Sequence, residues 1–151
     1  MQCRVVSATF AVLSVLALCL CAHAATCSTA TTAGDWGFSY SGVALTPSAQ
    51  IPVASAGRYS QDSSGNVSGK EVFNLAGTAS NQTIKGMFTV RADCTAEFRA
   101  NIYQNGQLVR TSVIDGVFVK NSTEVRAVFR SVVLPGGTNL PVVITIEGKK
   151  L

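Results

Sequence analysis

The chain has 151 residues, of which 47% are hydrophobic and 13% are charged, and its formal net charge at neutral pH is +4. This length suits one domain with a substantial core, and the charges are spread along the chain without the basic patch typical of nucleic-acid-binding domains. We therefore expect a single folded domain and no nucleic-acid partner.

The first 24 residues have the three parts of a secretory signal peptide. Arg4 supplies the positive charge, an uncharged apolar run covers residues 5–21, and Ala22-His23-Ala24 places small residues where signal peptidase cleaves. The run is short for a transmembrane helix, which needs about 20 residues. A lipoprotein signal is the alternative, but Cys19 and Cys21 each follow a leucine instead of a small residue. We expect cleavage after this segment, a secreted or periplasmic location, and no membrane span in the mature chain.

Removing the signal changes the inventory of reactive side chains. Eleven Lys and Arg residues remain against eight Asp and Glu residues, a net charge of +3. The sole histidine, His23, is lost, which excludes Ser-His-Asp and Cys-His catalysis and histidine metal sites. We expect no metal and no other cofactor. Five cysteines become two, and Cys27 and Cys94 are expected to form a disulfide, with two free thiols as the alternative.

The mature chain begins with small polar residues. Residues 25–34 are expected to form an extended arm attached through Cys27, and residues 35–151 one β-domain. In the first apolar run, Trp36, Phe38 and Tyr40 alternate with Gly and Ser, a period of two that is typical of a strand. Aromatic side chains with this spacing are expected to lie in the core.

Further runs with β-patterning follow, separated by turn residues. They cover residues 53–61, 67–79, 83–92, 94–104, 108–119, 124–134 and 140–147. Asn105-Gly106 is the strongest turn signal, because a type I′ hairpin needs positive φ at both central residues. No helical pattern is present. Eight strands with short links predict an all-β fold, an antiparallel up-and-down barrel of about eight strands, with a β-sandwich as the alternative.

An eight-stranded barrel is filled by side chains or holds one small ligand. Candidate ligand-binding residues are charged or phenolic side chains within the β-patterned runs. The residues to which we assign this role are Arg110, Arg58, Tyr59, Arg99, Tyr103 and Asp115. Further candidates for lining a cavity are Glu71, Glu124, Arg126 and Arg130. Arg110 is favoured because apolar side chains share its face, whereas cross-strand ion pairs on a solvated face are the alternative for each residue.

Four short motifs resemble segments of small exported bacterial proteins that carry no assigned activity. They are Trp36-Gly-Phe38, Asp62-x-x-Gly65-Asn-Val-Ser-Gly69, Phe88-Thr-Val-x-x-Asp-Cys94-Thr and Ser131-Val-Val-Leu-Pro-Gly-Gly-Thr-x-Leu-Pro141. The strand count is also similar to that of calycin-type and allene-oxide-cyclase-like barrels, including dirigent proteins. That architectural resemblance implies binding of apolar small molecules, or their orientation for cyclisation or coupling. No functional residue of those barrels matches a position in this chain.

Three functional hypotheses follow. The first is a non-enzymatic secreted barrel that binds a small apolar or anionic molecule. The second is a cyclase or coupling-guide enzyme in which Glu71, Asp115 or Glu124 assists from within a cavity. The third is a structural or interaction protein of the envelope or host interface, with an exposed apolar strand face. The pattern assigns no catalytic residue.

Overall fold

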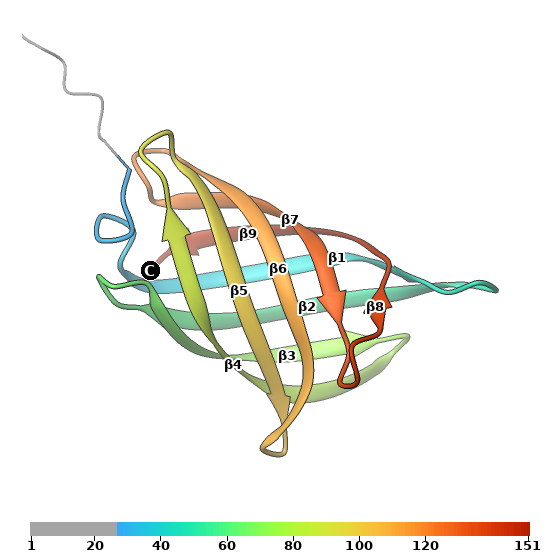
Figure 1. The fold of residues 1–151 in the computed structure, drawn as a ribbon. Coiled ribbons are helices and arrows are strands. Elements are labelled where there is room, and N and C mark those ends of the chain that lie inside the picture. Colours follow the sequence, from blue (N-terminus) through green and yellow to red (C-terminus); the bar gives the residue numbers. More distant parts are fainter. Residues whose placement is uncertain (1–26) are drawn as a thin grey trace, which may run out of the picture.

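Nine β-strands account for most of the part of the chain that the computed structural model describes, residues 27–151 (Figure 1). The strands are β1 (Gly34–Leu45), β2 (Gln50–Gln61), β3 (Asn66–Leu75), β4 (Thr78–Val90), β5 (Thr95–Gln104), β6 (Gln107–Val119), β7 (Glu124–Val133), β8 (Asn139–Leu140) and β9 (Val142–Lys150). The expected signal peptide lies outside the described residues. Within residues 27–151 no helix is long and apolar enough to cross a membrane.

Eight of these strands close into an antiparallel barrel. Each strand from β1 to β7 pairs with the next one along the chain, and β9 pairs with both β7 and β1 to complete the ring. The two-residue strand β8 pairs only with the end of β7. Closure gives the long strands partners on both sides and removes exposed edges. The predicted all-β barrel is therefore confirmed, and the β-sandwich is not what the chain forms.

Period-two alternation gives every strand an inner and an outer face. In β5, for example, Phe98 and Ala100 are buried, whereas Arg99 and Asn101, which alternate with them, are exposed. The inner side chains of one half of the barrel form an aromatic core in which the rings of Phe88 and Phe98 stack with centroids 4.5 Å apart. These inward residues exclude water and supply the main driving force for folding.

Two of the predicted runs are interrupted in the structure. The run predicted over residues 67–79 is divided by a turn at Ala76-Gly77, where both residues have positive φ (50° and 91°). The side-chain oxygen of Asn74 accepts a hydrogen bond from the Gly77 amide at 2.9 Å, which stabilises this turn. The last predicted strand, 140–147, is interrupted at Pro141, because proline has no amide hydrogen to donate to a sheet.

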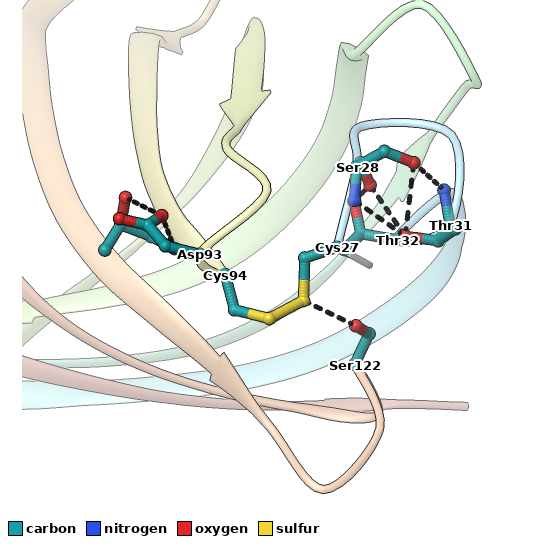
Figure 2. Close-up of a disulfide and its surroundings, with 8 residues drawn as sticks. Cys27, Ser28, Thr31, Thr32, Asp93, Cys94 and Ser122 are labelled. Atoms are coloured by element: carbon teal, nitrogen blue, oxygen red, sulfur yellow. Dashed lines mark hydrogen bonds between the residues drawn. A yellow bond between two sulfur atoms is a disulfide. The ribbon is translucent and has the colours of Figure 1, made fainter. Parts of the chain in front are cut away.

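The N-terminal segment covers one end of the barrel, where the disulfide lies (Figure 2). Cys27 and Cys94 are bonded across 67 residues of sequence, so the predicted disulfide is confirmed. The indole nitrogen of Trp36 donates to the carbonyl oxygen of Thr32 at 3.0 Å, and the side-chain Nε2 of Gln61 donates to the Thr32 hydroxyl at 2.9 Å. These bonds hold the segment over the aromatic core and close this end.

The opposite end carries the β1–β2, β3–β4 and β5–β6 connections and the link through β8 (Figure 1). The β5–β6 hairpin turns at Asn105-Gly106, and both residues have positive φ (52° and 80°), as the sequence predicts. No chain segment comparable to the N-terminal arm lies across this end in the described structure, and a cavity lined by the ends of these strands lies here.

Candidate ligand site in the barrel lumen

A buried polar network crosses the middle of the lumen. Arg110 of β6 donates from Nη2 to Glu71 Oε1 at 2.7 Å and to the Tyr40 hydroxyl at 3.0 Å, and from Nη1 to Gln82 Oε1 at 2.7 Å. The Ser55 hydroxyl donates to Glu71 Oε2 at 2.7 Å. The side chains of Glu71 and Arg110 are only 1% and 11% exposed. These five residues form one connected unit, the Arg110 network.

Strand register brings most of this network together. Tyr40 of β1 lies directly opposite Ser55 of β2, and Glu71 of β3 lies directly opposite Gln82 of β4. All four are on the inner faces of adjacent strands, whereas Arg110 reaches them from β6. The network therefore depends on closure of the barrel, because no ladder pairs β6 with β3.

The electrostatics of the network are those of a balanced pair of charges. An unpaired charge in a low-dielectric interior is very unfavourable, so Arg110 and Glu71 hold each other in the lumen. The ring of Phe73 also faces the guanidinium, with its centroid 4.5 Å from Cζ, a cation–π contact. Burial raises the pKa of the Tyr40 phenol well above its usual value, and the Arg110 charge opposes this only in part. Tyr40 therefore stays protonated and neutral.

A cavity of about 250 Å³, here named the mouth cavity, lies on the side of the network away from the arm. Its polar lining consists of Tyr40, Gln82, Gln104 and Arg110. The other lining residues are apolar, and they come from the strand ends and from the β7–β9 link. They are Ala44, Val53, Phe73, Leu75, Val109, Phe129, Val132, Leu134, Leu140, Val142 and Ile144. The mouth cavity thus has apolar walls and a hydrogen-bonding inner end.

A second, smaller cavity of about 60 Å³, the inner cavity, lies between the network and the aromatic core. Tyr40 and Arg110 line both cavities, so the network separates them. The hydroxyls of Tyr59 and Ser112 are buried beside the inner cavity and have no hydrogen-bond partner among residues 27–151. Burial raises the pKa of the Tyr59 phenol well above its usual value.

The six residues proposed from sequence fall on both faces of the barrel. Arg110 and Tyr59 point inward and line the cavities. Four others are on the outer face: Arg58, Arg99, Tyr103 and Asp115. Outside the barrel, Arg99 pairs with Glu97 at 2.7 Å, Asp115 lies 3.4 Å from Arg130, and Lys85 lies over the Tyr103 ring. These four do not meet the lumen residues.

The additional candidates divide in the same way. Glu71 is inside, whereas Glu124, Arg126 and Arg130 form ion pairs on the outer face. Of the three carboxylates proposed as alternatives for assisting a cyclase, the Asp115 and Glu124 side chains lie outside. Only Glu71 therefore remains available for chemistry within the lumen.

The sequence reading missed two polar members of the network. Ser55 is in phase with the inward residues Val53 and Tyr59, and Gln82 is in phase with Ile84. A polar residue in an otherwise apolar stripe is the signal that identifies such positions. For Gln82 the signal was hidden because the predicted runs end at residue 79 and resume at residue 83, whereas the turn lies at Ala76-Gly77 and Gln82 is within β4.

Among residues 27–151, no cluster of three or more His, Cys, Asp or Glu side chains is arranged to hold a metal ion. No protein-family model matches the chain, and a comparison with curated proteins found no similar sequence. The function has to be inferred from the lumen itself.

Proposed function

We propose that this protein is an exported binding protein that holds a small, largely apolar molecule in the mouth cavity. The observation that carries the proposal is a preformed cavity of about 250 Å³ with mostly apolar walls at one end of a closed barrel. Preformed apolar cavities with a few convergent polar groups are typical of small-molecule sites. The similarity to calycin-type barrels stays a prediction and adds only an architectural precedent.

The volume sets the size of the ligand. A protein cavity of about 150 Å³ holds a benzene molecule. By proportion, about 250 Å³ suits a molecule of roughly ten non-hydrogen atoms. Binding is favoured because it removes apolar surface of the ligand from water, at about 25 cal/mol for each Å². Two fused rings of the size of naphthalene meet this requirement, and because the cavity is open at the mouth, a slightly larger molecule can extend beyond it.

The proposed location outside the cytoplasm is supported by the Cys27–Cys94 disulfide, because such bonds persist in oxidising compartments. The arm that this bond attaches covers the far end of the barrel. A ligand would therefore enter and leave through the mouth.

The direct test is a titration of the ¹⁵N-labelled protein with naphthalene, followed by NMR. We expect saturable shifts of amide signals from residues that line the mouth cavity, such as Val53 and Leu140. Ala44→Phe places a ring in the cavity and should abolish these shifts, because Ala44 is buried in its wall. Ala54→Phe is the matched control, since Ala54 lies on the outer face of β2.

Thermal unfolding of both variants establishes that they are folded. If Ala44→Phe proves unfolded, Leu140→Trp at the partly exposed wall position fills the same cavity. Absence of saturable shifts in the wild type, or equal binding by the wild type and a folded cavity-filling variant, would refute the proposal.

A second candidate is an enzyme that orients its substrate for cyclisation or coupling. It is supported by the inward position of Glu71 beside the inner cavity. Both carboxylate oxygens of Glu71, however, accept short hydrogen bonds, from Arg110 and from Ser55. Both oxygens are thus already engaged by side chains of the network and neither is directed at a substrate, so the binding function is the better supported of the two.

A further inference from the structure

We propose that the mouth cavity selects uncharged ligands that carry a hydrogen-bond acceptor, such as a ketone, an ester or an amide, and rejects carboxylates. This inference rests on the proposed function and names its ligand class. It differs from the simplest interpretation of a buried arginine, which is an anion-binding site.

The positive charge that lines the mouth cavity is balanced by a buried carboxylate. Arg110 is the one charged residue among the described residues that line the mouth cavity. Its charge is balanced by Glu71, whose carboxylate lies 2.7 Å from Nη2 and is almost completely buried. A ligand carboxylate at Arg110 would bring a second negative charge close to Glu71 in a region of low dielectric constant. Like charges at such short range repel strongly.

The Glu71 side chain is held in place. Ser55 donates to its second oxygen at 2.7 Å, and strand pairing fixes Glu71 opposite Gln82. A ligand anion that displaced this carboxylate from Arg110 would leave Glu71 buried without its counter-charge, which is strongly destabilising. An anion that accepted from the remaining donors of Arg110 would lie beside a carboxylate that cannot move away.

Arg110 has N–H donors that the network does not use. A guanidinium has five N–H groups, and the contacts to Glu71, Tyr40 and Gln82 use three of them. The two others have no acceptor among residues 27–151. Because Arg110 lines the mouth cavity, a carbonyl oxygen of an uncharged ligand can accept from it without disturbing the ion pair.

The experiment compares 2-acetonaphthone with 2-naphthoate by isothermal titration calorimetry at neutral pH. The two molecules share one ring system and have equal numbers of non-hydrogen atoms, but only the second is charged. For the wild type we expect the ketone to bind at least about tenfold more tightly, because the carboxylate loses its hydration beside an already balanced ion pair and is repelled by Glu71.

The decisive variant is Glu71→Gln, which keeps the size of the side chain and its acceptor oxygen but removes the negative charge. The positive charge of Arg110 is then unbalanced, and the ratio of the two affinities should move toward 2-naphthoate by at least about tenfold. Glu147→Gln is the matched control, because it makes the same change on the outer face, where the side chain is 71% exposed. This control should leave the ratio unchanged.

The double variant Glu71→Gln/Arg110→Met provides a second test if Glu71→Gln is poorly folded. With both charges removed, the ketone should still bind more tightly than the carboxylate, because a carboxylate without a counter-charge loses its hydration in the apolar cavity. Because the donor is also removed, the ketone should lose its advantage over naphthalene.

The outcomes separate the two proposals. If none of the three naphthalene compounds binds the wild type, the proposed function fails. If the ketone and the carboxylate bind the wild type equally, or if Glu71→Gln and Glu147→Gln show the same ratio, binding stands and selection for uncharged ligands is refuted. If the double variant keeps the ketone's advantage over naphthalene, the hydrogen bond to Arg110 is refuted.

Discussion

The stability of the barrel should depend strongly on Arg110, because the guanidinium is the only partner that balances the buried charge of Glu71 within the described structure. Arg110→Met keeps the hydrocarbon part of the side chain but removes the bonds to Glu71, Tyr40 and Gln82. The Glu71 side chain is 1% exposed, so water cannot replace them. Removing one partner of a buried ion pair costs about 3–5 kcal/mol, and the free energy of unfolding should fall by that amount.

The assay is urea unfolding at neutral pH, followed by the fluorescence of Trp36, the single tryptophan of the chain. Arg99→Met is the control, since the Arg99 side chain is 65% exposed and its pair with Glu97 lies outside the barrel. An exposed ion pair contributes less than about 1 kcal/mol. The double variant Arg110→Met/Glu71→Gln should recover most of the loss, because both charges leave together.

Two results would contradict this reasoning. If Arg110→Met is no more destabilising than Arg99→Met, the lumen is hydrated enough to solvate Glu71 by itself. If the double variant is as unstable as Arg110→Met, the loss comes from packing or from the bonds to Tyr40 and Gln82, and the ion pair is not its cause.

Two further predictions concern the inner cavity and the closed end. Tyr59→Phe should raise the free energy of unfolding by about 1 kcal/mol, because it removes a buried hydroxyl without a partner. Tyr40→Phe makes the same deletion at a hydroxyl that accepts a hydrogen bond from Arg110, and it should lower the free energy of unfolding by about 1–2 kcal/mol. Urea unfolding of both variants measures the difference, and similar losses of stability would indicate that the Tyr59 hydroxyl is hydrogen-bonded. Cys27→Ser/Cys94→Ser opens a loop of 67 residues and should cost about 4 kcal/mol in the chain-entropy treatment, so an unchanged thermal midpoint would exclude a stabilising role for the disulfide.

Several features of the fold could be predicted from local sequence. Alternation in segments such as Trp36–Tyr40 specifies strands, because side chains on a pleated backbone point to opposite faces in turn. Asn105-Gly106 specifies its hairpin, because few residue pairs adopt positive φ at both positions at low cost. The Cys27–Cys94 disulfide followed from counting the cysteines that remain after the predicted signal.

The candidate site was predicted only in part. Arg110 and Glu71 were both recognised as possible lining residues, but Arg58, Arg99, Tyr103 and Asp115 lie on the outer face. Adjacent residues on a strand face opposite sides, and the sequence did not establish which side of each strand faces the lumen. Partly apolar outer faces made both choices plausible, as with Met87, which is exposed on β4.

Irregular pairing added a second obstacle. If β7 alternated strictly, Phe129 and Ser131 would point to the same face of the sheet. The β6–β7 register shifts between Val113 and Ile114, and this irregularity places the two side chains on different faces. Phe129 and Val132 consequently both line the mouth cavity. A bulge of this kind depends on the partner strand, so the sequence of β7 does not specify it.

The sequence by itself determined the strands, their hairpin order and the covalent link at one end, because these depend on neighbouring residues and on the number of cysteines. Tertiary structure alone decided that Arg110 meets Glu71, 39 residues earlier, and Tyr40, 70 residues earlier. The reason is geometric: closing the ring places the inner faces of β1, β3 and β6 around one lumen. Only there is the buried Arg110 side chain paired with Glu71 in one hydrogen-bonded network.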